Sequence, residues 1–239
     1  MYQISEAQLP LFTYLNDNCC QKPIRGIVLD FHGLGGGSQM ISQDSGLAQW
    51  YGENHLLYLI PYDNPWSWMN DTAVKTVDLI LDAVQKYYDL SSSVPIIATG
   101  GSMGGLGSLI FTRHSRHFIK ACAANCPVCD LLYHMTERPD LPRTIFSAFA
   151  HYPYSLEEAA AFSSPLHQAE SMPHIPYFIV HGEKDQAVNK AKHSDRFVKK
   201  MLALGHTIHY EQVPGMEHCA LSGMAKERYY QFILSQTLR

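Results

Sequence analysis

The chain has 239 residues, of which 46% are hydrophobic and 17% charged, a balance that supports a large buried core and excludes a disordered protein. Eighteen Lys and Arg against 22 Asp and Glu give a formal net charge of −4, which offers no basic surface to a nucleic acid. No apolar run approaches the roughly 20 residues of a membrane-spanning helix. The N-terminus lacks the basic and apolar segments of a secretory signal, so we expect a cytoplasmic protein without nucleic-acid or membrane partners.

Short β-rich segments alternate with helical patterns, an order typical of an α/β fold whose mostly parallel sheet is flanked by helices. We expect about eight strands in a single domain of residues 1–239, because α/β chains of this size often form one domain. Residues 2–15 predict one or two edge strands, and the strongest helical spacing of apolar residues begins at Asp71 and stops near Ser91. Further strands are expected at 25–31, 55–61, 94–99, 119–125, 177–181 and 206–213, and further helices at 38–52, 103–114, 188–204 and 222–237.

Residues 126–175 contain no strand-like run, although they separate two predicted strands. A structureless segment of about 50 residues is unusual inside a domain. Four prolines divide this segment, so we expect short helical pieces that form a small cap insertion. These prolines are Pro139, Pro142, Pro153 and Pro165.

The six cysteines are too few for a disulfide-dense scaffold. Cys122, Cys126 and Cys129 have a C-x₃-C-x₂-C spacing that superficially matches metal or iron–sulfur ligation. Cys122, however, lies in a small apolar strand, where cysteine is a compact core residue, and no fourth ligand completes a zinc pattern. We therefore expect neither a metal nor an organic cofactor.

Residues 100–104 (GGSMG) have the pattern G-x-S-x-G between a predicted strand and a predicted helix. A nucleophile elbow needs this order, because the serine sits on a tight turn and small flanking residues let the strand and helix approach each other. The pattern predicts that Ser102 is a catalytic nucleophile. The alternative is a glycine-rich turn without catalytic function.

A serine hydroxyl needs a base within hydrogen-bond reach and a carboxylate that orients this base. Chains with such an elbow supply them in the order Ser, then Asp or Glu, then His. Asp185 and His218 each follow a predicted strand, so they are expected at the sheet edge where open α/β sheets hold their sites. The alternatives, less well placed, are Asp130 and Asp195 for the acid and His206 and His209 for the base, whereas we expect His181 to be a packing residue before the turn.

Two backbone N–H groups are needed to hold the oxyanion that forms during acyl transfer. We expect one from Met103, directly after the nucleophile, and the other from Leu34, with Gly33 as its alternative, in the loop FHGLGGG. The same loop nearly matches a dinucleotide-binding fingerprint, in which Ser38 replaces the third glycine. Nucleotide binding would leave the serine elbow and the downstream Asp and His unexplained.

Trp66 and Trp68 follow the second predicted parallel strand on the same edge. Together with Gly33 they are candidates for the wall of an acyl or leaving-group pocket. An aromatic cover over the core explains two closely spaced tryptophans equally well.

The segments FHGLGGG, GGSMGG, HGEKDQAV and GMEHC together resemble the α/β-hydrolase superfamily over essentially the whole chain. Within it, residues 163–165 (SSP), the HGEKD-x-x-V run and the helix that ends at Leu204-Gly205 look like the catalytic domain of the prolyl oligopeptidase group, which also includes acyl esterases. The resemblance implies an α/β-hydrolase fold. Peptidases of this group usually carry an additional propeller or hood domain, for which we expect no room in this chain, so the analogy favours small esters.

We therefore expect a serine hydrolase that cleaves carboxylic esters through an acyl-enzyme intermediate. A peptidase that acts on short peptides with an Xaa-Pro bond is the first alternative, and a non-catalytic binding module is the second. The binding module is disfavoured because no member of the candidate triad is substituted. Haloalkane dehalogenase chemistry is excluded because it requires an aspartate at the position of Ser102.

Overall fold

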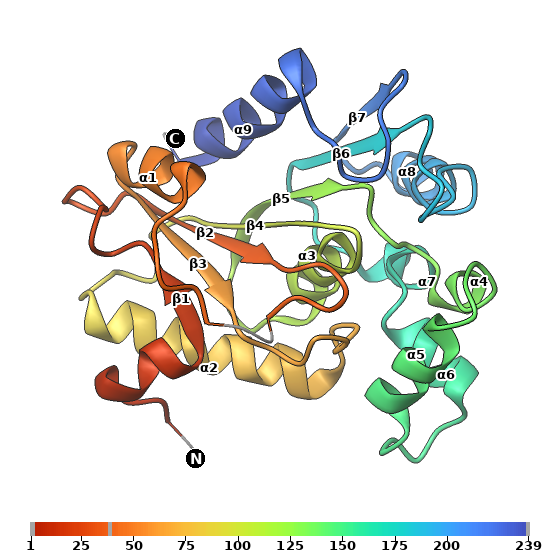
Figure 1. Ribbon diagram of the computed structural model, residues 1–239, viewed down its shortest axis with the longest axis horizontal. Helices are drawn as coiled ribbons and strands as arrows, with labels where there is room; N and C mark the ends of the chain where they lie inside the picture. Colours follow the sequence, from red (N-terminus) through yellow and green to blue (C-terminus); the bar gives the residue numbers. More distant parts are fainter. Residues whose placement is uncertain (1–2, 38–39, 238–239) are drawn as a thin grey trace.

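Seven strands form one central sheet in the computed structural model, which describes residues 3–37 and 40–237 (Figure 1). The strand order is β1-β3-β2-β4-β5-β6-β7, and all neighbouring pairs are parallel except β1 with β3. The six parallel strands predicted from the sequence are confirmed, with bounds that move by no more than two residues. The strands are β1 (Thr13–Leu15), β2 (Gly26–Phe31), β3 (Leu56–Pro61), β4 (Ile96–Gly101), β5 (Ile119–Asn125), β6 (Tyr177–Gly182) and β7 (Ile208–Val213).

The N-terminal segment supplies one short edge strand. Residues Glu6–Leu11 form a 3₁₀-helix, η1, that contains Pro10. Because proline has no N–H to donate to a sheet, only Thr13–Leu15 pair with β3. The described sheet therefore has seven strands, compared with the roughly eight expected from the alternating pattern. Tyr2, at the start of the predicted strand region, lies outside the described residues.

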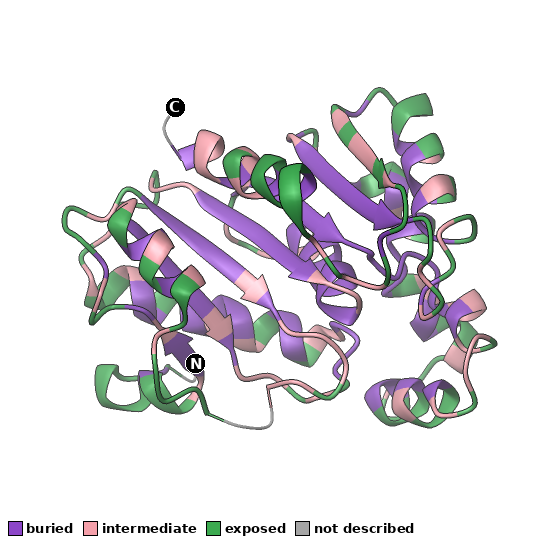
Figure 2. Cartoon of the chain, turned by 45° about the horizontal axis from the view of Figure 1, so that its top comes forward, coloured by how far each residue is buried: buried purple, intermediate pink, exposed green. Residues whose placement is uncertain are grey.

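Helices cover both faces of the sheet and make a three-layer structure. Tyr51 of α1 and Tyr229 and Ile233 of α9 pack in one core cluster, on one face. Leu81 of α2 and Leu106 of α3 pack in the cluster on the opposite face. In Figure 2 the inner strands are almost entirely buried, whereas the edge strand β7 contains only partly buried and exposed residues. The long helices are α1 (Gly46–Glu53), α2 (Asp71–Tyr87), α3 (Met103–His114), α8 (Ser194–Ala203) and α9 (Gly223–Thr237).

Two helices begin later than the apolar spacing predicts. Helix α1 begins at Gly46 instead of residue 38, and the Ser45 side chain caps it by accepting the N–H of Ala48. Residues 38–39 of the predicted range lie outside the described residues. Helix α8 begins at Ser194 instead of residue 188, because the preceding segment folds into a loop around Asp185. None of the described helices is long and apolar enough to cross a membrane.

Short helices fill the segment between β5 and β6, as its prolines indicate. Proline stands in the first turn of α5 and of α7, where its missing N–H costs no intrahelical hydrogen bond. These helices gather beside α8 at one side of the sheet (Figure 1). They are α4 (Leu131–His134), α5 (Leu141–Phe149), α6 (Leu156–Phe162), α7 (Pro165–Gln168) and the 3₁₀-helix η2 (Ala169–Ser171).

Candidate active site

Ser102 occupies the sharp turn between β4 and α3, with φ 60° and ψ −121°. A positive φ is unfavourable for a residue with a side chain, so surrounding contacts must hold this turn. The Ser102 N–H donates to the carbonyl of Asn125 over 2.9 Å, and the Ser102 carbonyl accepts the N–H of Leu106 over 3.1 Å. The backbone is thus tied to β5 on one side and to α3 on the other, which fixes the nucleophile candidate at the carboxyl ends of the strands.

The two glycines of the G-x-S-x-G pattern permit close backbone packing around this turn. A Cβ at Gly104 would overlap the carbonyl oxygen of Phe31 in β2. A Cβ at Gly100 would overlap the carbonyl oxygen of Gly104. Only glycine therefore lets β2, β4 and α3 converge at Ser102.

His218 and Asp185 meet in a hydrogen bond, although they lie in loops after different strands. His218 Nδ1 and Asp185 Oδ2 are 2.7 Å apart. The Asp185 side chain is fully buried, whereas the His218 side chain is 28% exposed. Burial alone would lower the pKa of His218, but the hydrogen bond and charge of Asp185, with a contribution from Cys126, raise it to about 9. Because Nδ1 is held by the carboxylate, Nε2 is the nitrogen that can accept a proton.

Asp185 is held as a charged carboxylate by several donors. Its Oδ1 accepts the N–H groups of Ala187 and Val188, each over 2.9 Å. His181 Nε2 lies 3.2 Å from Oδ2. Burial alone would raise the pKa of Asp185, but hydrogen bonds from His181, His218 and Val188 hold it well below its usual range. The sequence predicts a packing residue at His181, and in the structure its buried imidazole also contacts the acid.

The other acid and base candidates do not contact His218. Asp130 Oδ1 accepts the N–H of Tyr133, and its Oδ2 pairs with Arg196 over 3.1 Å, so this carboxylate caps α4. The remaining candidates have other partners: Asp195 pairs with Lys190 and Tyr210, His206 stacks on His174, and His209 stacks on Phe178.

The imidazole of His218 lies at the elbow without a direct hydrogen bond to Ser102 Oγ within the described part of the chain. His218 Nε2 is 3.7 Å from Cys219 Sγ. That thiol donates to the carbonyl oxygen of Asn125 over 3.6 Å, the same oxygen that accepts the N–H of Ser102. Cys219 thus connects His218 to the carbonyl oxygen that holds the Ser102 backbone. A nucleophile–base hydrogen bond is often long before substrate binds.

The loop after β2 lies beside the elbow because β2 and β4 are neighbouring parallel strands, with Phe31 opposite Gly100. His32 forms an ion pair with Asp63, and its Nδ1 lies 2.9 Å from the carbonyl oxygen of Gly33. These contacts hold the glycine-rich loop in place.

Backbone hydrogen bonds narrow the choice of oxyanion donors in this loop. The N–H groups of Gly35 and Gly36 donate to backbone carbonyls over 2.8 and 3.0 Å. The N–H groups of Gly35 and Gly36 are thus engaged within the backbone, and Leu34, with Gly33 as its alternative, stays the predicted second donor. Met103 is the first residue of α3, where an N–H has no acceptor within the helix.

The two tryptophans have different environments. Trp66 is 39% exposed and, with Tyr62, lines a cavity of about 390 Å³. Trp68 is fully buried; its Nε1 donates to Thr144 Oγ1 of α5 over 3.1 Å, and its ring meets the His134 ring edge-on. Trp68 thus covers the core and attaches its loop to the cap helices. For Trp66 and Gly33, a part in the substrate pocket stays a prediction.

The three cysteines with metal-like spacing do not gather in the described structure. Cys122 Sγ donates to Ser108 Oγ over 3.5 Å, and Cys129 Sγ donates to the carbonyl of Pro127 over 3.5 Å. Both side chains are fully buried, as expected for core residues.

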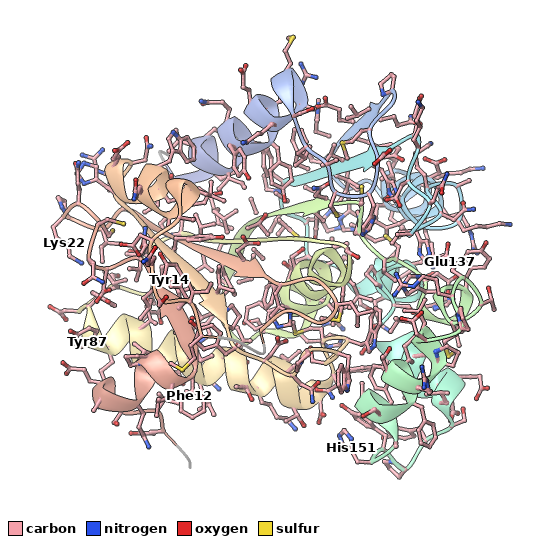
Figure 3. The ribbon with its side chains drawn as sticks, in the orientation of Figure 1. Phe12, Tyr14, Lys22, Tyr87, Glu137 and His151 are labelled. Carbon is pink, nitrogen blue, oxygen red and sulfur yellow. The ribbon has the colours of Figure 1, made fainter. Side chains whose placement is uncertain are left out.

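Glu137, labelled in Figure 3, joins the cap to the loop that carries Asp185. Its Oε2 accepts from His134 Nδ1 over 2.5 Å and from His193 Nε2 over 2.8 Å, and its Oε1 accepts the N–H of Asn189 over 2.8 Å. Although burial alone would raise the pKa of Glu137, the two histidines lower it to about 2. These donors saturate the carboxylate, so this buried group of two histidines and one glutamate serves as a structural cross-link.

Replacing Glu137 with alanine is expected to destabilise the protein by about 1–3 kcal/mol, because two buried histidines and the exposed N–H of Asn189 lose their acceptor. Chemical denaturation at pH 7 measures this loss. The pKa of Glu137 is lowered on folding, so the stabilisation is present at neutral pH and disappears as the pH falls below 4.5 toward about 2. Glu157→Ala, at an exposed position of α6, is the control; equal stability of both variants would contradict the cross-link.

A cavity of about 530 Å³ adjoins the acid and the base. It is lined by residues 183–187 together with Glu217 and His218. Its lining includes the acid and the base but not Ser102, Met103 or Leu34, so this cavity does not by itself mark where a substrate carbonyl would meet the nucleophile.

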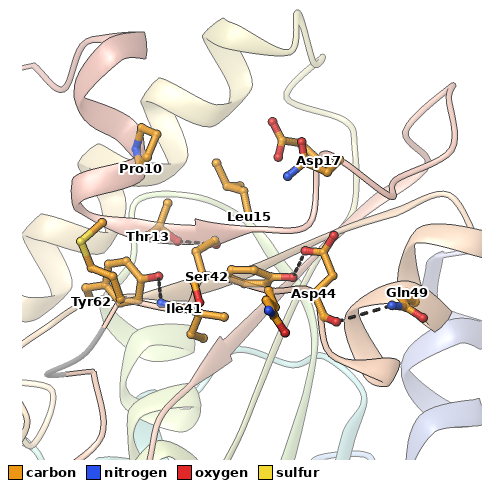
Figure 4. Close-up of a pocket in the computed structure, with 13 residues that line it drawn as sticks. Pro10, Thr13, Leu15, Asp17, Ile41, Ser42, Asp44, Gln49 and Tyr62 are labelled. Atoms are coloured by element: carbon orange, nitrogen blue, oxygen red, sulfur yellow. Dashed lines mark hydrogen bonds between the residues drawn. The ribbon is translucent and has the colours of Figure 1, made fainter.

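A second cavity of about 640 Å³ lies between β1 and residues 40–44 (Figure 4). There the Tyr14 hydroxyl donates to Asp44 over 2.5 Å, and the Tyr62 hydroxyl accepts the N–H of Ile41 over 2.8 Å. The residues that line it include no histidine, lysine or cysteine, so its serine, Ser42, has no imidazole or amine base among them.

Residues 67–237 match the model of the prolyl oligopeptidase family. The matched range includes Ser102, Met103, Asp185 and His218, whereas Leu34 and the rest of its loop precede it. No match was found among curated protein sequences.

Several solved structures share the fold at low sequence identity. Esterase B from Lactobacillus rhamnosis is 11% identical with a TM-score of 0.70, and the match covers 92% of this chain and 77% of that chain. A puromycin-hydrolyzing peptidase from Mycobacterium tuberculosis is 18% identical with a TM-score of 0.69, and the match covers 90% of this chain and 33% of the peptidase. An acylaminoacyl peptidase from Pyrococcus horikoshii is 14% identical with a TM-score of 0.70, and the match covers 89% of this chain and 36% of the peptidase. The chain thus spans about one third of the length of the two peptidases.

Proposed function

Because the chain belongs to the prolyl oligopeptidase family of serine hydrolases, we propose that Ser102, Asp185 and His218 form its catalytic triad and that it cleaves carboxylic esters. The observation that carries this proposal is the 2.7 Å contact between His218 Nδ1 and the buried Asp185 carboxylate, beside the strained turn of Ser102. A strained serine next to an oriented imidazole is the arrangement that nucleophilic acyl transfer requires.

In the first step, Ser102 Oγ attacks the carbonyl carbon of the ester and His218 Nε2 takes the hydroxyl proton. The tetrahedral intermediate then collapses, the bond to the leaving oxygen breaks, and His218 gives the proton to the departing alcohol. In the second step, water attacks the acyl-enzyme, its proton passes to His218, and Ser102 recovers a proton as the acid departs. Asp185 fixes the imidazole tautomer and stabilises the imidazolium in both steps.

The N–H groups of Met103 and Leu34 are proposed to hold the oxyanion. Met103 is suited to this by its place at the start of α3, where the helix dipole also favours negative charge. The loop of Leu34 is held beside the elbow by the ion pair of His32 with Asp63. Loss of one such donor typically costs about 2.7–4 kcal/mol of transition-state stabilisation.

The ester preference rests on analogy. The chain covers 77% of esterase B, whose name describes ester cleavage, and about one third of each of the two peptidases. Peptide cleavage is the second candidate function, since other similar structures are peptidases by name.

A substrate panel tests the proposal directly. We expect kcat/KM for aryl acetate and aryl butyrate to exceed that for a prolyl anilide by more than about 10-fold, a difference of about 1.4 kcal/mol in transition-state stabilisation. The Ser102→Ala variant, assayed in parallel, corrects for spontaneous hydrolysis of the activated esters. A higher kcat/KM for the anilide would overturn the ester assignment in favour of the peptidase.

A further inference from the structure

Two cysteine thiols lie beside the imidazole of His218. Cys219 Sγ is 3.7 Å from His218 Nε2, the nitrogen that the proposed mechanism uses. Cys126 Sγ, Cys219 Sγ and a ring nitrogen of His218 all lie within 4.8 Å of one another. The N–H of Cys219 also donates to Cys126 Sγ over 3.4 Å. The mechanism proposed above assigns no task to either thiol.

These three atoms have the spacing of ligands around a tetrahedral metal ion. Zinc–sulfur bonds of about 2.3 Å and zinc–nitrogen bonds of about 2.0–2.1 Å place a nitrogen and a sulfur ligand about 3.5–3.6 Å apart in a tetrahedron, and two sulfur ligands about 3.8 Å apart. The observed 3.7 Å between Nε2 and the Cys219 sulfur is close to the first value, and the upper bound of 4.8 Å for the others requires only small side-chain shifts. Two thiolates and an imidazole are the soft ligands that zinc and cadmium prefer.

The surroundings of the group also suit a metal ion. His218 donates its Nδ1–H to Asp185, and such a carboxylate behind a ligating imidazole orients the ring and increases its basicity. The negative charges of the two thiolates balance the two positive charges of the cation. The buried thiolate of Cys126 is therefore not left as an unpaired charge. The ion reaches the group through the half-exposed side chains of His218 and Cys219.

We propose that Cys126, Cys219 and His218 form a binding site for a thiophilic divalent cation, Zn²⁺ or Cd²⁺, and that the bound ion inhibits the hydrolase. On binding, each thiol releases its proton to solvent and forms a metal–sulfur bond, and Nε2 forms a metal–nitrogen bond with its lone pair. His218 can then no longer accept the proton of Ser102. The inhibitory part rests on the proposed function of His218 as the base, whereas the binding part does not.

Binding is tested first, without reference to activity. Zn²⁺ is titrated into the reduced protein in competition with a chromophoric chelator, in a Cys19→Ser/Cys20→Ser background that removes the other half-exposed thiol and its neighbour. We expect one high-affinity site in this background. Cys219→Ser and His218→Gln are each expected to weaken it at least about 100-fold, more than the 10–100-fold typical of a residue behind the ligands. Cys126→Ser is expected to have the same effect, and Cys219→Ser carries the test if the buried Cys126 variant does not fold.

Cadmium provides a second, spectroscopic measurement of the same site. Cd²⁺ bound to thiolates produces an ultraviolet charge-transfer band, which should appear on titration of the background protein and be strongly reduced in Cys219→Ser. A site of equal affinity and an equal cadmium band in all variants would overturn the proposal. The same applies if the background protein shows no high-affinity site.

Inhibition is then measured on an aryl ester as a function of free Zn²⁺. We expect the inhibition curve to follow the binding curve, and to move at least about 100-fold to higher zinc in Cys219→Ser relative to that variant's own metal-free rate. Cysteine-dependent binding together with an unchanged hydrolysis rate would overturn the inhibitory part and contradict His218 as the base. Absence of cysteine-dependent binding in an active enzyme would overturn the metal site and leave the triad assignment intact.

Discussion

Replacing Ser102 with alanine is expected to lower kcat for an activated aryl ester by about 10⁴–10⁶-fold, because the nucleophile of a serine hydrolase cannot be replaced by a methyl group. Substrate binding should change little, since the side chain loses only its hydroxyl. The remaining rate reports what the oxyanion donors and substrate positioning contribute without covalent catalysis. Steady-state hydrolysis of aryl acetate, together with labelling by a fluorophosphonate probe, measures the effect.

Two comparisons separate loss of chemistry from loss of structure. The Ser102→Ala protein should unfold at nearly the same denaturant concentration as the original chain, because both residues place a Cβ at the same strained φ of 60°. Ser92→Ala, in an exposed turn, should keep full activity and full labelling. Labelling or unchanged turnover in Ser102→Ala would remove Ser102 from the mechanism.

The order of strands and helices along the chain was predictable, because the spacing of apolar residues distinguishes strands from helices. The parallel sheet was predictable from their alternation. Parallel strands bring their carboxyl ends to one edge, so a serine, an aspartate and a histidine that each follow a strand are expected there regardless of their separation in sequence. Asp185 and His218, 33 residues apart, do meet at 2.7 Å. Their roles with Ser102 stay a prediction until the variants are measured.

Contacts chosen by tertiary packing were not predictable. Cys126 and Cys219 are 93 residues apart, and no spacing rule indicates that the two residues meet beside His218. The place of His181 before a turn predicts a packing residue, whereas its effect on the site comes from a side-chain contact with Asp185 across the following loop. Trp68 and Trp66 are two residues apart, yet one is buried and the other 39% exposed, because the intervening turn separates them.

The pair of Asp185 and His218 makes activity and stability depend on pH in opposite directions. The pKa of His218 is raised from 6.5 to about 9 in the folded protein, so its contribution to stability is full below pH 6.5 and is lost as the pH rises toward 9. A base must be neutral to accept the proton of Ser102, so kcat/KM rises over the same range. The pKa of Asp185 is lowered, so the carboxylate stays charged throughout this range.

Asp185→Asn is therefore expected to have two separable effects on ester hydrolysis. The rate should fall about 10⁴-fold, because an amide no longer fixes the imidazole tautomer or stabilises the imidazolium. The acidic limb of the pH profile of kcat/KM should also move to lower pH, because His218 loses the negative charge that raises its pKa. A purely structural effect of the substitution would lower the rate without moving this limb.

Asp130→Asn is the matched control for this prediction, because Asp130 also follows a strand and was the alternative acid. It pairs with Arg196 and does not contact His218, so its loss should leave the pH profile unchanged. The two variants each lose one carboxylate charge, so a general change in the charge of the protein affects both equally. A pH profile that moves in Asp130→Asn but not in Asp185→Asn would contradict Asp185 as the acid. Asp130 would then be the carboxylate that orients His218 toward Ser102.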